Sequence, residues 1–167
     1  SNRFSYLEHI QAGYASVDWK IKNWSFQLGL RGENTMYRGK SPTTGFETAN
    51  NYFQLVPKVF AMYETKKGNS WNFSYSRNFY RPGYDELNPF RYYTSSFSYR
   101  VGNPSLKPSV YHSMSVTTSV KDFTMNLYLG YDHKGSTTVA IFDNATQLQQ
   151  TTYANLYSSR SATLVFS

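Results

Sequence analysis

The chain has 167 residues, enough for one domain with a substantial core, and carries a net charge of +7. It contains no cysteine, which excludes a disulfide framework and a thiolate metal site, and no apolar run approaches the roughly 18 residues that a transmembrane helix needs. The positive charge allows nucleic acid, anionic lipid or acidic ligands as partners, but Lys and Arg form no block, so surface electrostatics is the simpler interpretation.

Aromatic residues form an unusually large share of the sequence. They make up 19% of the chain, with 16 Tyr, 12 Phe and 3 Trp, while hydrophobic residues total only 40%. A water-soluble core would draw more on Leu, Ile and Val, whereas amphipathic rings suit the belts at a membrane interface. The sequence begins in alternating residues without a visible signal peptide, so we expect either a removed signal or a piece of a longer chain.

Apolar residues recur at every second position along most of the chain, which predicts an all-β protein of about seven strands. Between residues 4 and 21 the apolar positions change from one face to the other, which predicts a bulge or a long twisted strand. Pro57 interrupts a later strand and predicts a bulge or a weakly paired spot, because proline has no N–H to donate. The expected strands cover residues 4–21, 24–33, 53–64, 71–76, 110–120, 123–132 and 153–166.

One strand shows the alternation most clearly. We expect its apolar side to face lipid and its polar side to face a wet lumen. The apolar side carries Trp24, Phe26, Leu28 and Leu30, and the polar side carries Ser25, Gln27, Gly29, Arg31 and Glu33.

The connections between the expected strands alternate in length. They are short at residues 20–23, 66–69 and 121–122, and long at residues 39–50, 81–108 and around 143–150. Short turns at one end and long loops at the other are typical of a transmembrane β-barrel. The sequence therefore predicts an antiparallel meander of about seven long strands that forms part of such a barrel.

The longest connection, residues 81–108, contains four of the six prolines of the chain. Asn88-Pro89 and Asn103-Pro104 predict turns, because the residue before proline avoids the helical region. We expect the prolines and Gly102 to form rigid corners, with Gly102 taking backbone angles closed to other residues. The corners should hold the middle of the loop at the outer mouth without requiring ladder pairing.

This loop is also the only candidate binding site in the sequence. Aromatic rings beside Arg suit a sugar, a peptide or a small anionic ligand, and the alternative is that the same side chains only pack the loop onto the barrel rim. Stacking on single-stranded nucleic acid is least favoured, so no nucleic-acid partner is expected. The candidate ligand-binding residues are Arg81, Tyr84, Arg91, Tyr92, Tyr93, Tyr99 and Arg100.

No catalytic or metal-binding motif emerges. His9, His112 and His133 lie on separate strands without the spacing of metal ligands. Adjacent carboxylates such as Asp85 and Glu86 more often point apart than act as an acid and base pair. We therefore expect no enzyme activity, no catalytic residues, no metal site and no cofactor.

Several motifs, taken together in order and spacing over roughly residues 4–108, resemble the β-barrel of TonB-dependent outer-membrane receptors. Specifically, they are similar to the outer-membrane β-barrel protein family common in Bacteroidetes-type bacteria. The motifs are Phe4-x-Tyr6-x-Glu8-x-Ile10-x-Ala12-x-Tyr14, Gly29-Leu30-Arg31-x-Glu33, Ser74-Tyr75-Ser76-Arg77, Arg81-Pro82-x-Tyr84-x-x-Leu87-Asn88-Pro89-Phe90 and Gly102-Asn103-Pro104-x-Leu106-x-Pro108.

The resemblance implies a larger parent protein in the bacterial outer membrane. Such receptors close a barrel of about 22 strands around a plug. Residues 1–167 would then be a single segment of the barrel wall, lacking the plug domain and the remaining strands. The implied partners are outer-membrane lipid, those missing parts, an energy-coupling protein that acts through the plug, and an unknown small-molecule, glycan or peptide substrate.

The sequence leaves two alternatives to a receptor barrel. One is a barrel without a transport role, such as an adhesin-like surface protein, and the other is a soluble β-sheet that binds a ligand.

Overall fold

The computed structural model describes residues 3–43 and 45–167. Nine strands form one sheet in the order β1-β2-β3-β4-β7-β8-β9-β6-β5, which confirms the all-β prediction. Seven strands are long, as expected, and the other two are short strands within residues 81–108. The elements are β1 (Ser5–Ile21), β2 (Trp24–Ser41), β3 (Phe46–Glu64), β4 (Ser70–Tyr80), α1 (Tyr84–Leu87), β5 (Tyr92–Ser95), β6 (Ser98–Arg100), β7 (Ser109–Val120), β8 (Phe123–Asp143) and β9 (Leu148–Phe166).

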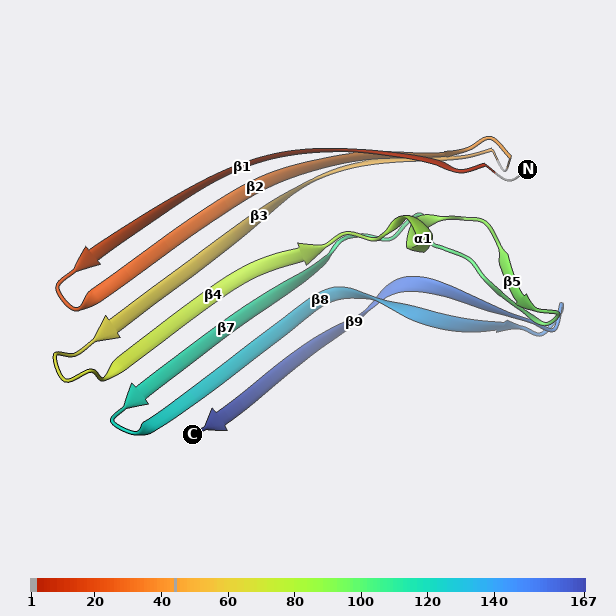
Figure 1. The fold of residues 1–167 in the computed structure, drawn as a ribbon. Helices are drawn as coiled ribbons and strands as arrows, with labels where there is room; N and C mark the ends of the chain where they lie inside the picture. The colour runs from red at the N-terminus through yellow and green to blue at the C-terminus, as the bar shows by residue number, and fades with distance from the viewer. Residues whose placement is uncertain (1–2, 44) are drawn as a thin grey trace.

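The sheet curls into a half-barrel that has two different ends (Figure 1). Tight turns close one end, where Lys22 and Lys121 adopt φ of 54° and 55° in the β1–β2 and β7–β8 hairpins. Positive φ at such a position matches the twist of a two-residue hairpin. The opposite end carries the extended β2–β3 and β8–β9 hairpins and residues 81–108. We call these the turn end and the outer end.

Two segments predicted to be long loops are strands instead. β2 continues to Ser41 and β3 begins at Phe46, so the expected loop at residues 39–50 is a paired hairpin with residues 42–45 between its strands. The polar stretch near residues 143–150 likewise contains only a short connection between β8 and β9. The sequence predicts loops there because the lipid-facing alternation stops, but a strand beyond the membrane needs no apolar face.

The sequence alternation separates two faces of the sheet. On the outward face of β1 and β2, Val17 lies opposite Leu28, and Trp19 stacks on Phe26 with ring centroids 5.0 Å apart. On the inward face the side chains are polar, and serines of β4 and β7 pair across the strands. The hydroxyl contacts are Ser74–Ser115 and Ser76–Ser113, both 2.7 Å.

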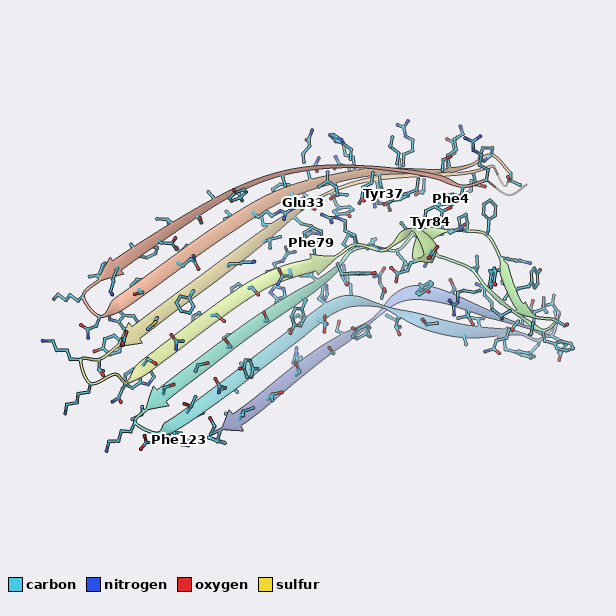
Figure 2. All side chains as sticks on the ribbon, in the orientation of Figure 1. Phe4, Glu33, Tyr37, Phe79, Tyr84 and Phe123 are labelled. Atoms are coloured by element: carbon cyan, nitrogen blue, oxygen red, sulfur yellow. The ribbon has the colours of Figure 1, made fainter. Side chains whose placement is uncertain are left out.

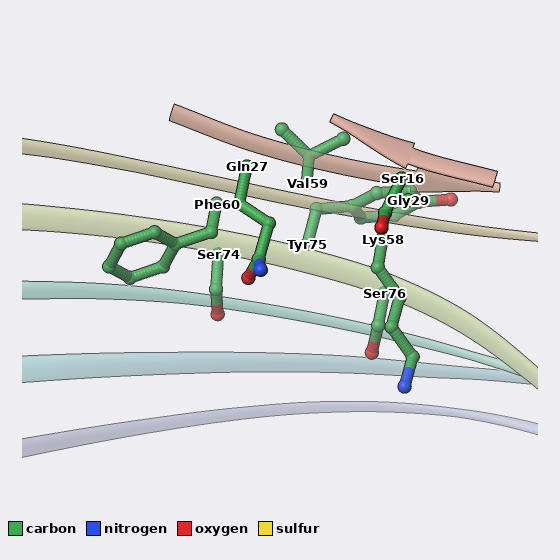
Figure 3. A pocket seen from close by; sticks show the side chains of 9 residues that line it. All are labelled: Ser16, Gln27, Gly29, Lys58, Val59, Phe60, Ser74, Tyr75 and Ser76. Atoms are coloured by element: carbon green, nitrogen blue, oxygen red, sulfur yellow. The ribbon is translucent and has the colours of Figure 1, made fainter. Parts of the chain in front are cut away.

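Figure 3 shows the same division at close range, in a hollow of about 430 Å³ on the inward face. Lys58, Ser74 and Ser76 extend from the side of the sheet opposite to Val59. This arrangement fits a wet lumen on one side and lipid on the other.

Of the two predicted causes for the change of apolar face within β1, the bulge is absent and the long strand is present. β1 pairs with β2 in unbroken register from Ser5 to Ile21. At the outer end its inward face packs against aromatic rings, with Phe4 5.5 Å from Tyr84 and Tyr6 5.7 Å from Tyr37. Toward the turn end the apolar residues lie on the outward face. β1 is therefore apolar on its inward face near the outer end and apolar on its outward face near the turn end.

Pro57 marks a weakly paired spot, as predicted, although no bulge forms there. It pairs in register with Leu30 of β2, but the β3–β4 ladder ends next to it, at Lys58 and Ser76. Arg77 bridges the two strands beyond that point, since its guanidinium donates to the Leu55 carbonyl and to Gln54 Oε1. The wall thus has a seam between β3 and β4 in its outer half.

α1 has four residues, and no helix in the described part of the chain is long and apolar enough to cross a membrane.

The face assignment can be tested by placing arginine at two adjacent positions of β2 in the full-length protein. Leu28→Arg puts a charge on the lipid-facing side and should cost about 2–4 kcal/mol of folding free energy, whereas Gln27→Arg faces the lumen and should cost little. Membrane insertion and the free energy of unfolding measured in lipid check this. Equal insertion and stability of the two variants would contradict the orientation.

Candidate functional site: the strap at the outer end

Residues 81–108, here called the strap, form a folded segment inside the curl of the sheet. Figure 1 shows it between the outer ends of β1–β3 and those of β8–β9. Leu87, Leu106 and Tyr99 are 3%, 2% and 7% exposed, and Tyr37 is the other hydrophobic residue found buried in the described part of the chain. Most of the fully buried apolar side chains therefore belong to the strap.

A buried ion pair ties the beginning of the strap to β2. The Glu33 carboxylate is 2% exposed and receives the Arg81 guanidinium on Oε1. On Oε2 it accepts a hydrogen bond from Arg31 Nη2 at 2.5 Å, and the Thr35 hydroxyl lies 3.4 Å from Oε1. Arg81 also lies over the Phe79 ring, 4.9 Å from its centroid, and Figure 2 places Glu33 and Phe79 at this junction.

The other end of the strap is bound to β9 on the far side of the curl. The Asn103 side chain donates to the Tyr153 carbonyl at 2.8 Å. Asn155 accepts from the Lys107 N–H at 2.8 Å and donates to the Lys107 carbonyl at 2.9 Å. The strap thus connects β2 to β9 across the mouth.

The two corners of the strap touch each other, and a glycine makes that contact possible. Gly102 N–H donates to the Asn88 carbonyl at 2.8 Å, and Asn103 N–H donates to the Glu86 carbonyl at 2.6 Å. A Cβ at Gly102 would lie 2.5 Å from the Asn88 carbonyl oxygen. Gly102 is not among the positive-φ residues of the described chain. The expectation of unusual backbone angles is therefore wrong, and close approach is the reason for glycine.

The middle of the strap pairs with the sheet, whereas the sequence predicted an irregular loop whose corners would hold it without requiring ladder pairing. β5 pairs antiparallel with β6, and β6 pairs in parallel with β9. β8 and β9 extend beyond β4 and β7 at this end, and the edge of β9 that faces away from β8 pairs with β6, which the sequence pattern did not indicate.

The candidate ligand residues divide into two groups. Arg81 is held by Glu33, and the buried Tyr99 donates its hydroxyl to Gln150 Oε1 at 2.8 Å, with the Arg91 guanidinium 4.7 Å from its ring centroid. Tyr84, although 47% exposed, packs on Phe4. These residues build the strap.

The second group lies at the surface of the strap. Tyr92 and Tyr93 are 72% and 58% exposed, and the Tyr93 ring lies 5.6 Å from that of Tyr99. Arg100 is exposed and lies opposite Tyr92 in the β5–β6 ladder. These three residues can contact a ligand without giving up a contact that holds the strap together.

Sequence reasoning missed the residues that hold the strap. The alternation places Glu33 only on the face of a wet lumen, although a lone acid two residues from Arg31 is the kind of signal that can mark an ion pair. The sequence predicts a turn at Asn103, and nothing near Asn155 indicates a role. Their partners are 48 to 50 positions away in sequence.

Burial also changes the acidity of one side chain beside the strap. Tyr6, near the outer end of β1, has its pKa raised to about 12, chiefly by burial and then by the nearby Glu8 carboxylate. The Tyr6 ring packs there against Tyr37. No cluster of His, Cys, Asp or Glu that could hold a metal occurs among the described residues.

The Glu33–Arg81 pair should hold the strap in place, and Arg81→Met in the full-length protein tests this. The change leaves a buried carboxylate with Arg31 as its remaining cation. Loss of one partner of a buried pair costs about 3–5 kcal/mol, and Arg31 should reduce that loss to the lower part of the range. The free energy of unfolding measures the effect.

Lys40→Met is the matched control, because Lys40 and Glu47 form an ion pair whose side chains are 59% and 63% exposed. Exposed pairs contribute little, so this change should leave stability unaltered. If the two variants lose the same stability, the buried pair is not the anchor of the strap.

Comparisons with known proteins agree with the geometry. No curated protein matches the chain. The solved siderophore receptor PirA from Pseudomonas aeruginosa is similar in fold, with a TM-score of 0.54 and 12% identity, over 99% of this chain and 40% of the receptor chain. The chain thus spans two-fifths of the length of that structure. The family model described as the outer membrane protein beta-barrel family matches residues 1–167, and the chain belongs to that bacterial outer-membrane family.

Proposed function

We propose that this segment forms part of the wall and outer rim of a TonB-dependent uptake receptor. The whole of residues 1–167 would be one continuous piece of the barrel. The role is that of a receptor and transporter, not of an enzyme. The remaining strands, a plug domain and an energy-coupling protein that acts on the plug would be its partners.

The observation that carries this proposal is the shallow curl of the sheet. Seven long strands enclose only about half of a barrel (Figure 1), so closure needs roughly twice as many strands or more, well above the eight of a small barrel and toward the roughly 16–22 of porins and plugged transporters. The similar fold of a siderophore receptor supports the plugged class. A barrel this wide needs a plug if it is to remain closed to unselected solutes.

The strap supports a role in substrate capture. It is anchored on both sides of the mouth and carries Tyr92, Tyr93 and Arg100 on its exposed side. Aromatic rings beside a guanidinium suit a sugar face, a peptide or an anionic chelate. The substrate is therefore proposed to be a small molecule, a glycan or a peptide.

Of the two alternatives to an uptake receptor, one is excluded and one remains. Membership of an outer-membrane family overturns the soluble β-sheet alternative. An adhesin-like barrel without transport remains a second candidate. It would need neither a plug nor a wide lumen lined by polar side chains such as Lys58, Ser74 and Ser76.

Ion conductance of the full-length protein in planar bilayers tests the proposal. A plugged receptor should be almost closed to ions, and deletion of the plug segment should open a large conductance, because the wide lumen is then filled with water. A control deletion of the exposed β2–β3 connection should leave the closed state unchanged. A small conductance that is the same before and after deletion would favour a small barrel without transport.

Substrate capture makes a separate prediction for the two groups of strap residues. Tyr92→Ala should reduce the uptake of a labelled ferric siderophore, glycan or peptide from a test panel about tenfold, since an aromatic contact of this kind contributes on the order of 1–2 kcal/mol. Its thermal stability should stay unchanged.

Tyr99→Ala is the matched control, because this buried tyrosine donates to Gln150. It should lower stability, and any loss of uptake should follow that loss. Equal effects of both changes on stability, without a selective loss of uptake for Tyr92→Ala, would mean that the strap only packs the rim.

A further inference from the structure

The edge of β9 that faces away from β8 is divided into two stretches. Over the outer stretch, β6 pairs with Gln149 to Thr151. Gln149 N–H donates to the Phe97 carbonyl at 2.8 Å, and Val101 N–H donates to the Thr151 carbonyl at 2.9 Å. Further along this edge, the Asn103 side chain donates to the Tyr153 carbonyl. With the Asn155–Lys107 contacts, the strap covers this edge down to residue 155.

The remaining stretch of that edge is unpaired. Among the described residues, no strand pairs with β9 on this side beyond Thr151. Near the turn end, Ser167 exchanges two backbone hydrogen bonds with Thr124, at 2.7 and 2.9 Å. Hydrogen-bonding direction alternates along an antiparallel strand, so Arg160, Ala162, Leu164 and Phe166 direct their N–H and C=O groups to the open side.

The unpaired stretch lies at the height of the lipid. Leu164 and Phe166 are 51% and 57% exposed, and they lie opposite Leu127 and Met125 in the outward-facing row of β8. Backbone groups cannot remain unpaired in the hydrocarbon region, because no water is present to satisfy them. Another strand must therefore pair with this stretch in the membrane, whereas the strap already pairs with the outer stretch.

We propose that the strap sets the upper limit of pairing on β9. The neighbouring strand of the intact barrel, a segment of the same chain, pairs antiparallel with residues 156–166 and stops pairing at residue 155, where the contacts between the strap and β9 start. This inference rests on the proposed closed barrel. The length agrees, since a transmembrane strand needs about 9–11 residues and residues 156–166 provide that number.

The opposite edge of the sheet, formed by β1, has no such limit on pairing. β1 pairs with β2 along Ser5–Ile21, and no described segment lies along its other edge. A neighbour of β1 can therefore continue into the outer half, but a neighbour of β9 cannot. The rim next to β9 is then formed by β5, which carries Tyr92 and Tyr93.

Hydrogen exchange of the full-length protein in detergent, read by mass spectrometry, tests the inference. In the unaltered protein, peptides covering residues 148–155 and residues 157–166 should both be protected. The double variant Val101→Pro, Asn103→Ala removes the two strap donors to Thr151 and Tyr153. Exchange in residues 148–155 should then rise about tenfold or more, as expected when hydrogen bonds that close a local region are lost. Residues 157–166 should be unchanged.

Thr94→Ala is the control, because Thr94 contacts only Ser98 at the tip of the strap hairpin in the contacts described. It should leave both peptides protected. If the double variant does not insert, Asn103→Ala alone should give a smaller rise in the same peptide.

A failure of this inference and a failure of the proposed closed barrel would give different exchange patterns. Protection of residues 148–155 after release of the strap would mean that the neighbouring strand pairs along the whole of β9, and the inference would be wrong. Rapid exchange of residues 157–166 in the unaltered full-length protein would mean that no strand covers this edge, and the closed barrel itself would be wrong.

Discussion

The carboxylate of Glu33 is the point on which the outer end of the sheet depends. It lies at the inward face of β2, almost fully excluded from solvent, and receives both Arg31 and Arg81. A buried charge is costly unless it is paired and hydrogen-bonded, so the inward-folded strap, which brings Arg81 to Glu33, adds a second cation to the one that Arg31 supplies. The pair therefore specifies one position for residues 81–108, and the contacts of that segment with β9 follow from it.

An inward strap explains why the sheet has an apolar core at all. A half-barrel wall between lipid and a wet lumen has no interior of its own, and its apolar residues face outward. At the outer end the strap adds a second layer, in which Tyr84 packs against Phe4, and Tyr6 and Tyr37 pack against each other on the inward face of the sheet. Two kinds of apolar burial thus occur on opposite faces of the same strands: lipid near the turn end and the strap near the outer end.

The strap also joins parts of the wall that the ladder leaves apart. Backbone pairing between β3 and β4 stops beside Pro57, and Arg77 bridges the seam above it. The strap leaves β4 at this height, reaches β2 through Arg81 and continues to β9 through Asn103 and Lys107. It therefore links strands on both sides of the seam, which helps to keep the exposed residues Tyr92, Tyr93 and Arg100 in a fixed place at the mouth.

The sequence alone determined the all-β class, the seven long strands, the tight turns at one end and the outward face of Trp24 to Leu30, because two-residue periodicity and turn residues are local signals. It also determined that residues 81–108 differ from the wall. Only the tertiary structure decided that residues 39–50 form a hairpin, that Gly102 allows the two corners of the strap to approach closely, and that Arg81 and Tyr99 contact Glu33 and Gln150 while Tyr92 is exposed. Those outcomes depend on Glu33, Asn88, Gln150 and Asn155, and most of these partners are brought together by the curl of the sheet, which leaves no trace in local spacing.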